Sequence, residues 1–395
     1  LSAATSGTDT MYCVFLGKAV QTVVPPAGSV TGSTLADDVI SAQSALGATP
    51  ADTDEFLVSD AGVLKRVDYS YIKPTSQIYR DAQPIMINGN FEVWQRGTSF
   101  TSAGYTCDRW YQDLSGATAT LSRQTFTVGQ SDVPSNPKYH LRQTVSTANN
   151  NCGVFYRHED VTTLTGNITI AFYAKGTNPN GGNLNIITKQ SFGSGGSTAV
   201  ETSTQNITLT GSWQQFVFNF SLASISGKTV GAGSYLQMLI KQPDGDSSTN
   251  AWTLDLANFQ VEEGTYTSAT LPPFQSETYG NNLARCQRYF QMRAEGNQKI
   301  ISIAHWAGGT EVDFIMQIPF MRTKPSIEYT TGSEYWAIGG SGGSTNTLDN
   351  LNMNSWSTEM NINLWTTTGA GGTAGYAYYG YTNNASAKLG FTAEL

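Results

Sequence analysis

Nine short segments between residues 84 and 275 alternate apolar and polar side chains, and turns rich in Gly, Ser and Asn separate them. Successive side chains of a β-strand point to opposite faces, so a two-residue period predicts strands with one buried face. Short strands at this spacing are typical of an antiparallel sandwich of the jelly-roll type, which we expect for residues 84–275. The nine expected strands are Ala117–Thr127, His140–Val145, Gly153–Tyr156, Asn167–Ala174, Leu184–Lys189, Val200–Leu209, Gln214–Phe220, Tyr235–Lys241 and Trp252–Val261.

Two stretches are expected to close this sandwich as its first and last strands. Pro84–Tyr111 starts with alternating apolar residues around an Asn-Gly-Asn turn and continues with crowded aromatic and charged residues. Ala251–Gly264 alternates Trp252, Leu254 and Leu256 before the pattern breaks at an asparagine. We therefore expect these two stretches to lie side by side.

The region before the sandwich is predicted to contain two parts. Residues 1–26 hold a strand pattern at Met11–Val24 and are interpreted as the end of an N-terminal β-domain. Because the first Met is Met11, we expect the chain to be part of a longer or processed polypeptide. Residues 27–83 are polar, with an expected short helix at Thr34–Leu46 and a hairpin at Glu55–Asp68. So few apolar residues can hardly form a core alone, and we interpret this part as a stalk built by several chains.

Residues 276–395 are expected to form a small terminal β-domain that begins with a helix. Ser276–Ala294 carries apolar residues at helical spacing, and Ser276 or Thr278 is a suitable N-cap. Strand patterns follow, interrupted by Gly- and Ser-rich turns. The whole chain is thus predicted to be all-β with one short helix in this domain and another in the stalk.

Charge and composition exclude several partners. Charged residues make up only 13% of the 395 residues, about half the usual share, and the net charge is −8. No basic run is longer than Lys65-Arg66, so nucleic acid and anionic membranes are poor partners. No apolar run reaches the roughly 20 residues that span a bilayer, and we expect no membrane insertion. The four cysteines show no zinc spacing; buried free thiols are expected, with a Cys107–Cys152 pair as the alternative.

Several stretches, taken in order, resemble the distal part of bacteriophage tail-fibre proteins. They are NGNFEVWQRG, CDRWY, FYAKG, GSWQQFVFNF, LANFQVEEG and ARCQRYFQ, with MYCVFLGKAVQTVVPPAGSV and DEFLVSDAGVLKRVDYS upstream and AEL at the close. Cys107 departs from the pattern, since the family more often has a small residue there. The sandwich also resembles carbohydrate-binding modules of the jelly-roll type.

The resemblance implies a homotrimeric tail fibre of a virion, made in the host bacterial cytoplasm. Such a fibre attaches to the host cell by binding a surface polysaccharide, and its N-terminal part joins phage tail or baseplate proteins. Two alternatives stay open. One is a glycan depolymerase of the tailspike kind, and the other is a purely structural fibre segment whose receptor module lies on another protein.

A depolymerase would need two carboxyl groups about 5 to 9 Å apart. Glu262 and Glu263 are adjacent and would point to opposite faces of a strand. The three histidines lack a GxSxG nucleophile motif, so no catalytic residue is predicted. The other acidic candidates are Glu92, Asp108, Asp113, Glu159, Asp160 and Asp255.

A structural calcium ion is the one expected metal, and no other cofactor is predicted. Glu92 in the first expected strand and Asp255 in the last could meet, and Asn88 or Asn90 could add a carbonyl oxygen. Calcium prefers such oxygen ligands. The alternative is an Asn-capped turn beside a buried acid that accepts backbone hydrogen bonds.

Aromatic residues are the strongest functional signal. They make up 11% of the chain, and Trp and Tyr rings stack on the apolar faces of sugars. Core packing is the alternative for at least half of them, including Trp110, Trp213 and Trp252. We expect the terminal domain to carry the receptor-binding tip, with a second group in the sandwich. The candidate sugar-binding residues are Trp306, Tyr335, Trp336, Trp356, Trp365, Tyr376, Tyr378, Tyr379 and Tyr381 in the terminal domain, and Trp94 and Tyr105 in the sandwich, where Trp110, Tyr111 and Trp213 complete the aromatic group.

Overall fold

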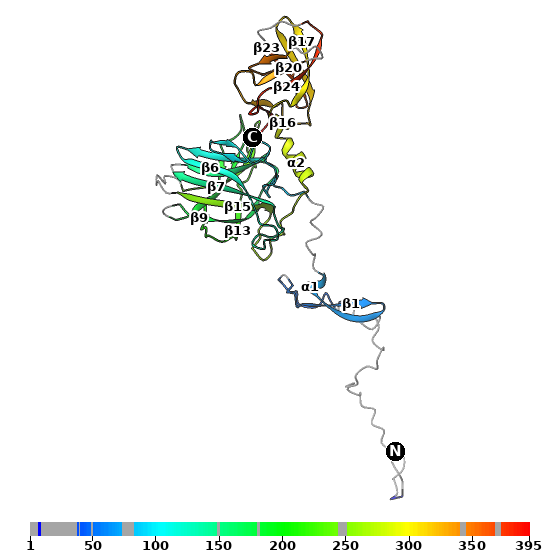
Figure 1. Ribbon diagram of the computed structural model, residues 1–395. Helices are drawn as coiled ribbons and strands as arrows, with labels where there is room; N and C mark the ends of the chain where they lie inside the picture. The colour runs from blue at the N-terminus through cyan, green and yellow to red at the C-terminus, as the bar shows by residue number, and fades with distance from the viewer. Residues whose placement is uncertain are drawn as a thin grey trace. The chain divides into compact units, whose positions relative to one another are not determined.

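The computed structural model describes residues 7–8, 38, 40–48, 50–72, 83–147, 151–179, 182–243, 251–339, 345–367 and 373–395. The chain divides into two units, Leu1–Thr75 and Ser76–Leu395. Almost all regular structure in the described residues is antiparallel β-sheet, which confirms the all-β prediction (Figure 1).

The first unit contains the predicted hairpin. Strands β1 (Glu55–Asp60) and β2 (Val63–Asp68) pair antiparallel, with Asp60 opposite Val63. Ala61 and Gly62 form the two-residue turn, both with the positive φ that tight hairpin turns require. A single turn of helix, α1 (Tyr69–Ile72), follows. The helix expected at Thr34–Leu46 is wrong in its described part, because residues 40–46 form only turns and irregular chain. The strand expected at Met11–Val24 lies outside the described residues.

The sandwich consists of two sheets that face each other. One has the order β13-β9-β15-β7-β6-β3, and the other β11-β10-β14-β8-β5-β4 with β12 also on β10 (Figure 1). Residues that alternate inward from both sheets form one apolar core. The strands are β3 (Ser99–Phe100), β4 (Gly104–Tyr105), β5 (Trp110–Ser115), β6 (Thr118–Thr125), β7 (Tyr139–Thr147), β8 (Asn151–Glu159), β9 (Asn167–Thr177), β10 (Leu184–Ser191), β11 (Val200–Glu201), β12 (Gln205–Ile207), β13 (Gln214–Ser221), β14 (Tyr235–Lys241) and β15 (Trp252–Glu263).

The start of Pro84–Tyr111 lies beside β15, as predicted, but it does not form the predicted strand. Residues 85–93 form turns and irregular chain, because Asn88 and Phe91 have positive φ angles that a strand does not allow. They nevertheless lie against β15, since the Phe259 amide donates to the Gly89 carbonyl at 2.8 Å. Strand β15 pairs with β7 and β9 and is therefore a central strand of its sheet.

Helix α2 (Tyr279–Gln287) is shorter than the predicted Ser276–Ala294. Thr278 is the N-cap, as predicted, and accepts a hydrogen bond from the Asn281 amide. The helix ends early because β16 (Phe290–Glu295) pairs with β25 (Lys388–Thr392), so tertiary pairing overrides the helical pattern.

The terminal β-domain has its own core, separate from that of the sandwich. It contains a three-stranded sheet, β16-β25-β19, and a seven-stranded sheet, β21-β20-β24-β17-β18-β23-β22. The remaining strands are β17 (Ile300–Gly308), β18 (Glu311–Gln317), β19 (Ser326–Tyr329), β20 (Trp336–Gly339), β21 (Thr345–Leu348), β22 (Asn352–Met353), β23 (Asn361–Thr367) and β24 (Ala377–Thr382).

Cys107, Cys152 and Cys286 are buried free thiols, which confirms the prediction for these three residues. Burial raises the pKa of the Cys152 thiol to about 12, so that thiol stays protonated and unreactive. No helix among the described residues is long and apolar enough to cross a membrane.

Candidate functional site

The outer face of the sheet that contains β8 and β14 carries a row of apolar side chains. Tyr105 on β4 lies opposite Tyr111 on β5, which lies opposite Phe155 on β8. The row continues through Leu239 on β14 to Ile187 on β10. The neighbours of these residues along each strand point inward to the core. We call these five residues the aromatic row.

The rings of the aromatic row pack against one another. Tyr111 stacks on Phe155 with centroids 4.5 Å apart and an interplanar angle of 12°. Tyr105 meets Tyr111 edge to face at 5.2 Å. The Arg157 guanidinium lies 4.7 Å from the Phe155 centroid and donates to the Gln237 side-chain oxygen at 3.1 Å. Five strands at about 4.8 Å spacing make the row roughly 19 Å long, which suits an oligosaccharide and not a single sugar.

Polar side chains flank the aromatic row and line a pocket of about 180 Å³ at its β10–β14 end. Burial raises the pKa of Asp113 there. Lys189 forms an ion pair with Glu201 at 3.0 Å. The pocket therefore offers both hydrogen-bond donors and acceptors beside an apolar floor, which is the combination that sugars need. Its lining residues are Asp113, Ile187, Lys189, Glu201, Gln237, Leu239 and Lys241.

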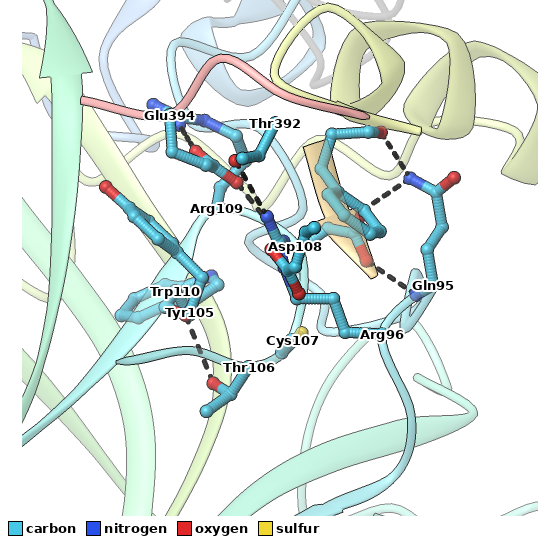
Figure 2. A network of polar contacts seen from close by, with 12 residues as sticks. Gln95, Arg96, Tyr105, Thr106, Cys107, Asp108, Arg109, Trp110, Thr392 and Glu394 are labelled. Carbon is cyan, nitrogen blue, oxygen red and sulfur yellow. Dashed lines mark hydrogen bonds and ion pairs between the residues drawn. The ribbon is translucent and has the colours of Figure 1, made fainter. Parts of the chain in front are cut away.

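A buried ionic network lies at the other end of the row, around β4 (Figure 2). Glu394, which follows β25, pairs with Arg109 and with Arg96, and all three side chains are at most 4% exposed. The Arg96 guanidinium packs on the Phe290 ring at 3.5 Å, and that of Arg109 packs on the Tyr289 ring at 3.5 Å. We call this group the Glu394 network; it joins the terminal β-domain to the sandwich.

Tyr105 and Asp108 connect the Glu394 network to the aromatic row and to the first stretch. The Tyr105 hydroxyl donates to the Leu395 backbone oxygen at 2.6 Å, and burial, with the Glu394 charge, raises the pKa of Tyr105 to about 12. The Asp108 carboxylate accepts from the backbone and the side-chain amide of Gln95 at 2.7 and 2.6 Å. Burial nevertheless raises the pKa of Asp108 to about 6. Gln95 also donates to the Phe290 carbonyl at 2.8 Å. The aromatic and charged residues crowded in Pro84–Tyr111 therefore help to hold the sandwich and the terminal β-domain together.

Three of the predicted sugar-binding residues are wrong as surface contacts. Trp306 and Trp336 belong to the core of the terminal β-domain and are 1% and 0% exposed. Trp94 is 8% exposed, and its indole donates to the Phe91 carbonyl. Large rings are buried here because each domain is small and needs them to fill its core.

The other predicted aromatic residues remain accessible but do not form one cluster. Trp356 is 77% exposed in the loop between β22 and β23. Tyr379 is 62% exposed and lies opposite Ile303. Its neighbours on that face of the sheet are mainly aliphatic. Tyr376 is exposed, and the half-buried residues are Tyr105, Tyr335, Trp365, Tyr378 and Tyr381.

Each of the three expected calcium ligands accepts hydrogen bonds from other residues of the chain. Both oxygens of Asp255 accept from Arg142 at 2.6 Å, and the Asn88 side-chain oxygen accepts from the backbone amides of Glu92 and Val93. Glu92 accepts from Asn90 at 3.2 Å. The described residues contain no group of three or more His, Cys, Asp or Glu placed to hold a metal. The Asn-capped turn of the alternative is present at Asn88, but the buried acid, Asp255, is bonded to the Arg142 side chain and not to backbone amides.

Tyr105 and Tyr111 belong to the aromatic group predicted from the sequence, but the rest of the aromatic row does not. Phe155, Leu239 and Ile187 are single apolar residues on outer faces that are otherwise largely polar; Leu239, for example, lies between Gln237 and Lys241 on the outer face of Tyr235–Lys241. A strand in an antiparallel sandwich normally has one polar face. The missed signal was therefore one apolar residue at an outward position of each strand, and only the pairing of β8, β14 and β10 brings these residues into one row.

No protein-family model and no curated protein matches the chain. Among solved structures, a putative sugar binding protein from Bacteroides thetaiotaomicron is similar with a TM-score of 0.30 and 11% identity, covering 46% of this chain and 100% of that one. A family 11 carbohydrate-binding module from Clostridium thermocellum gives a TM-score of 0.28 and 12% identity over 46% of this chain and 96% of the module. The enzymatically active domain of tailspike protein 4 from bacteriophage CBA120 gives 0.28 and 12% over 45% of this chain and 21% of that chain. At these identities and TM-scores the likeness carries no argument about function.

Proposed function

We propose that the chain is a glycan-binding attachment protein, and that its aromatic row binds an oligosaccharide segment of a host surface polysaccharide without cleaving it. The observation that supports the proposal is the row itself, which runs over five adjacent strands beside hydrogen-bonding groups. Tyr105, Tyr111 and Leu239 are its half-buried members and offer the contact surface, whereas Phe155 and Ile187 are only 5% and 7% exposed and support them from below. Ring faces stack on sugar C–H groups, and flanking polar groups fix the orientation of the hydroxyls.

The test is a binding screen of the whole chain against surface polysaccharides and their oligosaccharides, with Tyr111→Ala beside the wild type. Loss of the central ring should weaken binding at least tenfold, which corresponds to about 1.4 kcal/mol. Tyr279→Ala is the matched control, because Tyr279 is 53% exposed on α2 and outside the row. Equal binding by the wild type and Tyr111→Ala would refute a role for the row.

The same samples decide between binding and hydrolysis. Asp113 and Glu201 both line the pocket beside the row and are the carboxyl pair that a hydrolase would use there. Glu201 is already engaged in an ion pair with Lys189 at 3.0 Å. We expect no release of reducing ends from any bound polysaccharide. Release that Asp113→Asn abolishes would establish the depolymerase alternative.

We further propose that the chain acts as a trimeric tail fibre of a virion, attached to tail proteins through its N-terminal part. Support comes from the first unit, where Leu57, Val63 and Leu64 of the hairpin are 73%, 59% and 69% exposed. A lone two-stranded hairpin is marginal in water, so burial by other copies would stabilise it. Light scattering on the whole chain should give three times the monomer mass. A stable monomer would contradict this proposal without affecting the aromatic row.

A further inference from the structure

A second pocket, of about 550 Å³, opens at the β4 end of the aromatic row. We call it the junction pocket, because the sandwich contributes Tyr105 and the terminal β-domain contributes the other lining residues. Tyr105 belongs to both the pocket and the row, so a ligand of the pocket would lie next to the first residue of the row. The charged lining residues are Arg322, Lys324, Glu328 and Glu394.

The two acids of the junction pocket are already neutralised. Glu394 is paired with Arg96 and Arg109, and Glu328 accepts from Arg96 at 3.3 Å. Both arginines are held on aromatic rings behind the pocket and are at most 4% exposed. The negative charge of these acids is therefore matched by cations that do not themselves line the pocket.

The two cations of the junction pocket have no such partner. Arg322 donates to the backbone oxygens of Ala393 and Glu394 at 2.9 and 3.1 Å. Lys324 donates to those of Asn354 and Ser355 at 3.3 and 2.7 Å. Among the residues that the structure describes, no carboxylate forms an ion pair with either cation. Backbone oxygens orient a cation but leave its net charge uncompensated.

From this charge distribution we infer that the junction pocket binds an anionic substituent of the glycan, so that the ligand of the aromatic row is an acidic polysaccharide. This inference rests on the proposed glycan binding and names its ligand class. Carboxylate, sulfate and phosphate groups share the required chemistry, because each accepts charge-assisted hydrogen bonds from Arg and Lys. The net charge of −8 does not oppose local binding, since charges farther than about 8 to 10 Å are screened at physiological salt.

The experiment compares acidic oligosaccharides with their neutral parents. One arm uses uronate oligosaccharides and their carboxyl-reduced forms, and a second uses sulfated or phosphorylated oligosaccharides and their unsubstituted forms. Wild type, Arg322→Gln, Lys324→Gln and the charge-preserving Lys324→Arg are titrated by calorimetry at low and at physiological salt. Lys228→Gln is the control for loss of one exposed lysine elsewhere, near Phe192 of the sandwich. Thermal unfolding of each variant checks that it is folded.

We expect the wild type to bind at least one acidic oligosaccharide about tenfold more tightly than its neutral parent, with the difference shrinking as salt rises. Arg322→Gln and Lys324→Gln should remove that difference and leave binding of the neutral parent unchanged, while Lys324→Arg and Lys228→Gln should keep it. Three results would overturn the inference. The wild type could bind acidic and neutral oligosaccharides equally, it could bind no acidic oligosaccharide at all, or its preference for the acidic form could persist in both Arg322→Gln and Lys324→Gln.

Tyr111→Ala, included in the same titrations, separates this inference from the proposed function. Neutral binding that Tyr111→Ala abolishes, without any acidic preference, would keep the aromatic row and refute the junction pocket. An acidic preference that depends on Arg322 and Lys324 but not on Tyr111 would keep the pocket and refute the row.

Discussion

Replacing Glu394 by Ala should destabilise the second unit far more than a surface ion-pair mutation does. Glu394 is 4% exposed and is the shared partner of Arg96 and Arg109, which are 4% and 1% exposed. Removal of the carboxylate leaves the two buried guanidinium groups with Glu328, which is half exposed and pairs only with Arg96, and with the buried Asp108, whose charge also interacts with Arg96.

The magnitude follows from burial. Removing one partner of a buried pair costs about 3–5 kcal/mol, because the remaining charge stays desolvated and uncompensated. Arg109 keeps its hydrogen bond to the Arg157 carbonyl and its contact with the Tyr289 ring, which places the expected loss near the lower limit. Glu394→Gln keeps the shape of the side chain and one hydrogen-bond acceptor, so it should lower the unfolding free energy less than Glu394→Ala does.

Urea unfolding, followed by tryptophan fluorescence, measures this loss of free energy. Glu201→Ala is the matched control, since the Glu201–Lys189 pair is 53% and 39% exposed and should contribute at most about 1 kcal/mol. A double-mutant cycle with Arg109→Met isolates the coupling between the two buried groups. A loss for Glu394→Ala as small as that for Glu201→Ala would refute the assignment of the Glu394 network as the junction between the domains.

Four further outcomes are expected. Burial raises the pKa of Asp108 from 3.8 to about 6, so the folded state binds the extra proton in this range. The unfolding free energy should therefore fall by about 2.4 kcal/mol as pH rises from about 4 to 7. Asp108→Asn should lack this fall, and urea titrations at both pH values measure it. Excess EDTA should leave the melting temperature unchanged, and a rise on adding calcium would contradict the geometry. Gly89→Ala, whose Cβ would lie 2.1 Å from the Phe259 carbonyl oxygen, should lose about 1–3 kcal/mol, whereas Gly280→Ala, with nothing within 4 Å, should not lose stability. In the terminal β-domain, Trp336→Ala should cost about 3–5 kcal/mol and the exposed Trp356→Ala under about 0.5; similar values would refute the burial argument.

The sequence predicted most strands of the sandwich well, because alternation is a local property that burial of one sheet face enforces. The strand expected at Tyr235–Lys241, for example, has the bounds of β14. The single strand expected at Val200–Leu209 is an exception, since it forms two short strands, β11 and β12. Backbone conformation in the first stretch was not predictable, since Asn88 and Phe91 adopt positive φ only in the context of β15 and its neighbours. The helix end was likewise decided by pairing between residues about 100 positions apart, Phe290 with Thr392.

The candidate site was predicted only in part, and the reason is geometric. Aromatic content identifies rings but not the side of a sheet on which they stand, so Trp306 and Trp336 were indistinguishable from surface residues. The aromatic row requires the order of strands within a sheet, and that order depends on long-range pairing. The junction pocket requires, in addition, the meeting of the Tyr105 region with residues near Glu394.

The pairing of Arg109 with Glu394 also sets an order of events in time. The two residues are 285 positions apart, and a ribosome that adds about 5–20 residues each second needs roughly 15 to 60 s to make the intervening chain. The sandwich strands emerge during that interval, while Arg109 has no carboxylate from Glu394 to accept its charge. We therefore expect the nascent sandwich to remain loosely closed around β4 and β5 until β25 docks, so that the final folding step is also the step that completes the junction pocket.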